Sequence, residues 1–255
     1  MHPLNIKIAK QGGVVRLTLD RPKHNMLNIE MLKELISQLE TQAGDVDMKC
    51  LVILGEGPSW CAGLDLGGHR PEVMEELIVT LSRLFELMDK IEVPTIAAVH
   101  GACLGGGMEI AIACDMIIAA KSSIFSQPEI KFGFLPPYAA IRLPKLVGPA
   151  KAMEICLTGK RYSADEARIM GFVSKVMDDD KLAEGLEKLI GEIATSSPCI
   201  IRLNKLAIKQ NLEKPFPHSL QGAEDIFINT LMKTEDMQEG IMSYFEKRKP
   251  DWKNR

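Results

Sequence analysis

The alternation of apolar and polar residues predicts that the chain begins with a β-hairpin. Apolar residues recur at every second position around Ile6 and Ile8 and again over residues 14–19, and Gly12 and Gly13 separate the two runs. Alternation with a period of two around a pair of glycines is typical of two antiparallel strands joined by a tight turn.

The following segments predict that helices alternate with buried strands. From Asn28 to Gln42, apolar residues recur three or four positions apart, which predicts an amphipathic helix capped by Asn28. Cys50 to Leu54 is apolar throughout, as in a strand buried on both faces. The same reasoning predicts a helix over Val73–Ile91, a strand over Thr95–Val99, a helix over Met108–Cys114 and a strand over Met116–Ala119. This alternation indicates an α/β core with mainly parallel pairing.

The pattern changes in the last part of the chain. From Pro149 onward helical periodicity predominates, apart from the short segment Val173–Met177. We therefore expect an α/β core over residues 1–195 and a C-terminal helical region over residues 196–255, with a soft boundary near residues 190–200.

Composition and charge argue against several classes of protein. The chain has 255 residues, of which 46% are hydrophobic and 25% charged, so a sizeable globular core can form. A formal net charge of -3 and a pI of about 6.0 provide no basic field to hold DNA or RNA. The most apolar stretch, Ile110–Ala120, contains Asp115 and is shorter than the roughly 20 apolar residues of a membrane span. We expect neither a nucleic-acid partner nor a membrane partner.

The cysteines and the chain ends bear on the cellular compartment. The six cysteines include no CxxC pair and no histidine at zinc-ligand spacing, which predicts reduced, mostly buried thiols and no metal site. The first residues lack the basic and apolar regions of a secretory signal, and the last residues are not Ser-Lys-Leu. These features predict a cytoplasmic protein.

Three consecutive glycines, Gly105–Gly107, stand between an expected strand and an expected helix. Glycines at such a turn permit unusual backbone dihedrals and leave N–H groups exposed, so the turn is suited to bind an anion or an oxyanion. A phosphate loop of the GxxxxGK[ST] type requires Lys and Ser or Thr after its last glycine, and this chain has Met108 and Glu109 there. Because the carboxylate would repel phosphate, we favour an oxyanion.

Two glutamates are candidates for acid–base chemistry. Glu109 lies three residues after Gly106 and so on the same side of the expected helix. Alternatively it caps that helix, although the apolar residues after it favour burial and a function. Glu129 follows Pro128 in a turn after an apolar strand, and taken alone it would be interpreted as a solvent-facing loop carboxylate. Together the two carboxylates can hold one water molecule and exchange proton roles.

Four segments form a combination that is specific although each alone is weak. They are Trp60-Cys-Ala-Gly-Leu-Asp65, His100-Gly-Ala-Cys-Leu-Gly-Gly-Gly-Met-Glu109, Phe125-Ser-Gln-Pro-Glu-Ile130 and Gly133-Phe-Leu-Pro-Pro-Tyr-Ala-Ala140. In order and spacing they resemble the crotonase (enoyl-CoA hydratase) superfamily, and the resemblance covers nearly the whole chain. It implies a crotonase (ClpP-like) α/β spiral of ββα units with a C-terminal helical oligomerisation region, assembled as a homotrimer or a dimer of trimers.

The resemblance also implies roles for individual residues. Glu109 and Glu129 would be the acid–base pair, and the backbone N–H groups of Ala62 and Gly106 would form an oxyanion hole for the enolate. The substrate would be an acyl-CoA thioester, with no cofactor beyond its own coenzyme A. Asp65 would rather fix its loop than touch the substrate, and Lys23 is equally consistent with an ordinary surface lysine. The expected substrate-binding residues are Arg21, Lys23, Leu64, Asp65, Leu66, Gly105, Pro137 and Tyr138.

The loop after Glu129 departs from ordinary enoyl-CoA hydratases, which tend to read Gly-x-x-Pro-Gly-x-Gly-Gly-Thr-x-Arg-Leu. Here Pro137, Tyr138, Ala139 and Ala140 replace the glycine-rich part, so the acyl pocket should be reshaped and stiffer. The Cys-Leu-Gly-Gly-Gly run, the Pro/Ala-Ala loop and the Trp-x-Asn-Arg end are more similar to cyclohexa-1,5-diene-1-carbonyl-CoA hydratases of anaerobic aromatic degradation. That similarity implies hydration of an alicyclic dienoyl-CoA.

Alternatives remain open at this point. A general enoyl-CoA hydratase or isomerase acting on fatty-acid-type substrates, a thioester hydrolase and a decarboxylase would all use the same enolate chemistry. A non-catalytic RNA-binding or scaffold protein of the same fold is a further alternative, against which the acidic pI and the intact glutamate pair argue.

Overall fold

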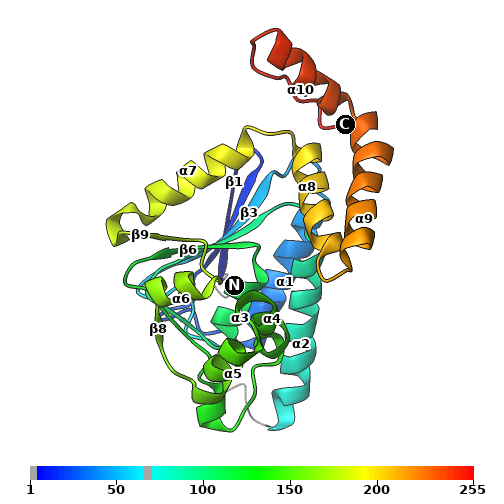
Figure 1. The fold of residues 1–255 in the computed structure, drawn as a ribbon. Helices are drawn as coiled ribbons and strands as arrows, with labels where there is room; N and C mark the ends of the chain where they lie inside the picture. Colours follow the sequence, from blue (N-terminus) through cyan, green and yellow to red (C-terminus); the bar gives the residue numbers. More distant parts are fainter. Residues whose placement is uncertain (1–4, 66–70) are drawn as a thin grey trace.

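The computed structural model describes residues 5–65 and 71–255. A six-stranded sheet forms the centre of the body (Figure 1), and its strands lie in the order β1 (Ile6–Gln11), β2 (Val14–Leu19), β3 (Cys50–Gly55), β4 (Thr95–Val99), β6 (Met116–Ala120) and β9 (Lys175–Met177). β1 and β2 are antiparallel, which confirms the hairpin, and each later pair of neighbours is parallel, as the apolar strands predicted.

A smaller three-stranded sheet brings the two chemistry-bearing segments together. Its strands lie in the order β5 (Ala102–Leu104), β7 (Ile124–Ser126) and β8 (Tyr162–Ser163). β5 and β7 are parallel, and Leu104 pairs with Ser126 at their carboxyl ends. The glycine run follows one strand and the segment with Glu129 follows the other, so both leave the same edge of this sheet.

The helices begin and end near the predicted positions. Asn28 caps the first of them, since its Oδ1 accepts a hydrogen bond from the Met31 N–H at 3.0 Å. Helices of the body are α1 (Ile29–Ala43), α2 (Pro71–Lys90), α3 (Gly106–Ala113), α4 (Pro137–Val147), α5 (Pro149–Thr158), α6 (Ala164–Met170) and α7 (Leu182–Ala194). The remaining helices are α8 (Pro198–Asn211), α9 (Phe216–Asn229) and α10 (Glu235–Phe245), and the 3-10 turns are η2 (Glu129–Phe132), η3 (Asp179–Lys181) and η4 (Leu231–Lys233).

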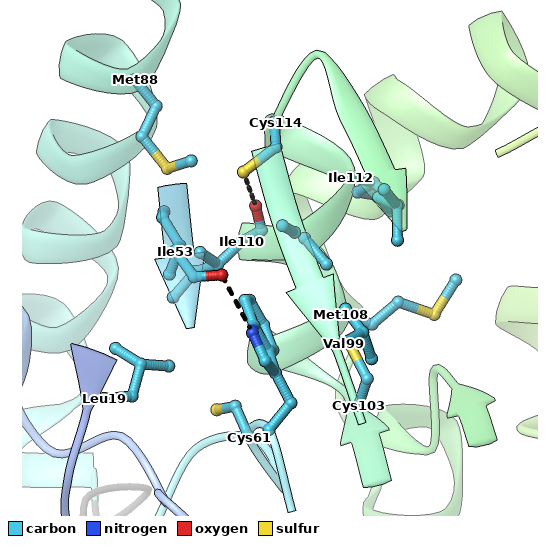
Figure 2. Packing of buried hydrophobic residues seen from close by; sticks show 14 of the residues in the cluster. Leu19, Ile53, Cys61, Met88, Val99, Cys103, Met108, Ile110, Ile112 and Cys114 are labelled. Carbon is cyan, nitrogen blue, oxygen red and sulfur yellow. Dashed lines mark hydrogen bonds between the residues drawn. The ribbon is translucent and has the colours of Figure 1, made fainter. Parts of the chain in front are cut away.

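The core continues into α3, the helix that carries Glu109. Figure 2 shows Met108, Ile110 and Ile112 in a cluster that also contains Cys61 and Cys114. α3 begins at Gly106, two residues before the predicted start, because glycines are required there. A Cβ on Gly107 would lie 2.5 Å from the Cys61 carbonyl oxygen, so the helix packs directly on the backbone of the neighbouring loop.

The C-terminal helices differ in how they contact the body. α8 lies against the body, whereas α9 and α10 extend away from it (Figure 1). Lys205 on α8 is buried and donates to Asp115 Oδ2 at 2.6 Å and to the Val93 carbonyl at 2.7 Å. α9, η4 and α10 expose several large apolar side chains, among them Phe227, Ile228, Met232, Ile241, Met242 and Phe245. In residues 5–65 and 71–255, no helix combines the length and the apolar character needed to cross a membrane.

Candidate active site

Glu109 lies in the first turn of α3. Its carboxylate caps the start of α4 and not the start of its own helix, which was the alternative that the sequence left open. The side chain is 1% exposed, and its Oε1 accepts hydrogen bonds from the Tyr138 N–H at 2.8 Å and the Ala139 N–H at 2.9 Å. Both donors belong to the first turn of α4, where amides have no intrahelical acceptor and the helix dipole favours an anion. Burial raises the pKa of Glu109, and the two N–H groups oppose that rise.

Glu129 has a different environment. It begins η2, which two residues separate from β7, and burial together with the nearby charge of Glu109 raises its pKa to about 7. The amide of buried Gln127 faces this carboxylate, and with its nitrogen on that side it donates to Oε2 at 2.9 Å. One carboxyl group is thus held by two main-chain donors, while the other is poised between its protonation states near neutral pH.

Gly105 allows Glu129 to approach the start of α3. Its φ of +51° lies in the left-handed region, and its N–H donates to the Ser126 carbonyl at 2.9 Å. A Cβ at this position would lie 2.5 Å from Glu129 Oε1. The expected substrate-binding glycine therefore lies against the second carboxylate, and a side chain at this position would displace that carboxylate from its present place.

The structure corrects the expectation that Ala62 provides an oxyanion-hole N–H. That N–H donates to the His24 carbonyl at 2.9 Å and is therefore already paired. Gly63, with a φ of +98°, turns the backbone after Ala62, so the direction of the next N–H group changes.

Leu64 has a backbone N–H group in a better position for an oxyanion hole than that of Ala62. Its neighbours both bond to Leu27: the Gly63 carbonyl accepts from the Leu27 N–H and the Asp65 N–H donates to the Leu27 carbonyl, each at 2.8 Å. The Leu64 N–H between them therefore points away from Leu27. A Cβ on Gly106 would lie 3.0 Å from Leu64 Cγ, so the two residues are neighbours. Within the described residues neither the Leu64 N–H nor the Gly106 N–H has an acceptor.

The other expected binding residues occupy mixed positions. Arg21 donates to Asp65 Oδ2 at 2.9 Å and to the Met26 carbonyl at 2.6 Å, so this pair fixes the loop. Lys23 and Pro137 are exposed, and Leu66 lies outside the described residues.

Three neighbours of the site were not predicted from the sequence. They are Ala139, which donates to Glu109; Gln127, which faces Glu129; and Phe85 on α2, on which the Tyr138 ring stacks at a centroid distance of 3.9 Å. Gln127 could have been found from the sequence, because it lies two residues before the candidate acid Glu129. Nothing in the sequence links Phe85 to Tyr138. Among the described residues, no group of three or more His, Cys, Asp or Glu side chains is placed to hold a metal ion.

Comparison with known proteins identifies the family. Residues 9–255 match the family described as enoyl-CoA hydratase/isomerase. The chain belongs to this family. Solved enoyl-CoA hydratases share its fold. A Geobacillus kaustophilus structure superposes with a TM-score of 0.91 at 31% identity and covers 98% of both chains. The expected crotonase fold is confirmed.

Several curated relatives align over almost the full length of the chain. Crotonyl-CoA hydratase of Syntrophomonas wolfei is 34% identical, with 97% of each chain covered. Cyclohexa-1,5-dienecarbonyl-CoA hydratase of Thauera aromatica is 29% identical, with 99% of this chain and 98% of the relative covered. With the family match, these relatives show an enzyme of the hydro-lyase class, of the enoyl-CoA hydratase type.

The close approach of Gly105 to Glu129 gives a test of the site. We expect Gly105→Ala to lower kcat/KM for enoyl-CoA hydration by about a hundredfold, because a displaced catalytic group costs on that order. The control is Gly12→Ala, in the hairpin turn, where φ is +59° and a Cβ would meet nothing within 4 Å. Both glycines have a positive φ, but only at Gly105 would the added Cβ meet Glu129, so equal losses of activity would contradict the assignment of Gly105.

Proposed function

We propose that this member of the enoyl-CoA hydratase/isomerase family adds water across the α,β double bond of an acyl-CoA thioester, with Glu109 as base and Glu129 as acid. The observation that carries the proposal is the unequal setting of two neighbouring carboxyl groups. Burial raises the pKa of both groups, but the N–H groups of Tyr138 and Ala139 oppose the rise at Glu109, whereas the charge of Glu109 adds to it at Glu129, where the pKa is about 7. At neutral pH such a pair can hold one proton on Glu129.

The proposed reaction balances within this pair. Glu109 takes a proton from water as the water oxygen bonds to the β-carbon, and the electrons of the double bond move to the thioester oxygen as an enolate. The N–H groups of Leu64 and Gly106 stabilise that oxygen. The enolate then collapses as Glu129 delivers its proton to the α-carbon, and proton transfer from Glu109 to Glu129 restores the starting state. No step requires an oxidant or a reductant.

We propose an alicyclic dienoyl-CoA, cyclohexa-1,5-diene-1-carbonyl-CoA, as the substrate within this class. Two observations support this choice: the near full-length alignment with the Thauera aromatica relative, and the loop at Pro137 and Tyr138. The rigid prolines start α4 beside the base, and an aromatic ring follows them. Anaerobic aromatic degradation would be the corresponding role. The competing substrate is a linear enoyl-CoA, as in the name of the Syntrophomonas wolfei relative.

Other parts of the expectation also remain proposals. We propose that coenzyme A lies along the loop that Arg21 and Asp65 fix, with Lys23 exposed beside it. We propose that residues 196–255 form the oligomerisation region of a trimer or a dimer of trimers, which sedimentation velocity on the full chain tests. The exposed apolar side chains of α9 and α10 support this assembly. The cytoplasmic location stays a proposal of the same kind.

Removing either carboxylate should abolish hydration without unfolding the protein. Glu109→Gln and Glu129→Gln are each expected to lower kcat by at least about a thousandfold, because a positioned acid or base contributes on the order of 10²–10⁴. Both variants should still bind coenzyme A in calorimetry. Glu184→Gln, an exposed position on α7, is the control and should keep full activity. Either catalytic variant with wild-type activity would remove that residue from the mechanism.

The pH dependence follows from the two unequal carboxyl groups. The active pair holds one proton, so kcat/KM should fall tenfold per pH unit above about pH 7, where Glu129 loses that proton. It should also fall on the acid side, where Glu109, with a pKa above its ordinary value, gains a proton. Initial rates of hydration between pH 4 and pH 9 measure both limbs, and a rate that stays flat from pH 6 to pH 9 would contradict the role of Glu129.

A direct comparison of substrates tests the alicyclic assignment. We expect kcat/KM for cyclohexa-1,5-diene-1-carbonyl-CoA to exceed that for crotonyl-CoA by at least about tenfold, a difference of roughly 1.4 kcal/mol in transition-state binding. Coupled spectrophotometric assays on one enzyme preparation measure both values. A higher kcat/KM for crotonyl-CoA would contradict the alicyclic substrate assignment but would not contradict the proposed hydratase mechanism.

A further inference from the structure

A second space lies next to the candidate active site. A cavity of about 560 Å³ is lined by residues of α8 and of the body, and neither Glu109 nor Glu129 contributes to its lining. Much of the wall is apolar, from Pro94, Ala113, Met116, Ile193, Ile200, Ile201, Ile208 and Leu212. The wall also contains charged residues, but most of them are paired: Lys205 donates to Asp115 and Lys209 to Asp89, each at 2.6 Å. The apolar part of the space is suited to a hydrocarbon chain.

Tyr138 belongs both to the cavity and to the active site. Its backbone N–H donates to Glu109 at 2.8 Å, and the residue also lines the cavity. The ring stacks on Phe85 with an interplanar angle of 15°, and Phe85 is buried in the main core. Because one face of the ring is covered by a core residue, the Tyr138 side chain is fixed.

We propose that the Tyr138–Phe85 stack is the distal wall of the acyl pocket and restricts the enzyme to compact acyl groups, short or ring-shaped. The inference rests on the proposed hydratase function and names the limit on its substrate. In this proposal the stack stands between the catalytic pair and the 560 Å³ cavity, because Tyr138 contacts Glu109 through its N–H and also lines the cavity. A longer linear chain has no room beyond the stack, and it would gain access to an apolar space if the ring were removed.

The test compares acyl lengths in three forms of the full-length enzyme. These are the wild type, Tyr138→Ala, which removes the wall but keeps the backbone N–H that Glu109 needs, and Tyr138→Phe, which keeps the ring. We measure kcat/KM for crotonyl-CoA and trans-2-decenoyl-CoA. The wild type and Tyr138→Phe should favour the short substrate. In Tyr138→Ala the ratio of long to short should rise by at least about tenfold, since each buried methylene is worth about fourfold.

A binding measurement separates this inference from the proposed function. Calorimetric Kd values for butyryl-CoA and decanoyl-CoA, which lack the reactive double bond, report the wall without turnover. If the enzyme hydrates no enoyl-CoA, the proposed function fails while these Kd values still test the wall. Decanoyl-CoA should bind Tyr138→Ala at least about tenfold more tightly than it binds the wild type.

Two outcomes overturn the proposal. One is a wild-type enzyme that handles the ten-carbon substrate as well as the four-carbon one. The other is a length preference that is the same in Tyr138→Ala and in the wild type, which would show that the ring only packs against α2. If Tyr138→Ala does not fold, as judged by circular dichroism, Phe85→Ala removes the other half of the stack and must produce the same shift in length preference.

Discussion

The arrangement of the site depends on one buried carboxylate held by the start of another helix. Burying a glutamate carboxylate without hydrogen-bond partners is unfavourable for folding. Two main-chain N–H groups of α4 donate to Glu109 and offset that unfavourable free energy. This contact fixes how α3 and α4 lie relative to each other. It requires that α4 begin at Pro137, so that the next two amides are free, and that α3 begin at the glycine run. The Glu109 side chain is thus part of the packing between the helices of the body.

The packing gives Glu109 and Glu129 different electrostatic environments, although both are glutamates. Both are buried, and burial raises the pKa of each; donors from a helix terminus oppose the rise at Glu109, whereas the charge of Glu109 adds to it at Glu129, whose pKa is about 7. The parallel register of β5 and β7 brings both segments to one edge, and Gly105 permits their close approach. Backbone geometry therefore decides which group can act as acid.

The sequence was sufficient for features that repeat along the chain, and insufficient for those that depend on one dihedral or one distant contact. Periodicity located the hairpin, the cap at Asn28 and the parallel strands, because many residues contribute to each signal. The two-residue strand β8 is too short to produce a pattern. The expectation of an oxyanion-hole N–H at Ala62 was wrong, since the hydrogen bond from the Ala62 N–H to the His24 carbonyl joins two separate segments and no sequence pattern signals it.

In the first turn of α4, the backbone and the side chain of Tyr138 have different contacts. The backbone N–H donates to Glu109, whereas the side chain stacks on Phe85. Glu109 needs only the N–H groups of residues 138 and 139, and every residue except proline supplies one. Ala139 is buried in the core, but the partly buried side chain at position 138 can change without loss of that contact. Tyr138 uses this freedom to stack on Phe85 beside the cavity at α8. The main-chain contact to Glu109 therefore does not dictate the side chain at position 138. Relatives of this chain carry the names of hydratases for different acyl-CoA substrates, and activities that differ within one fold arise from such local differences.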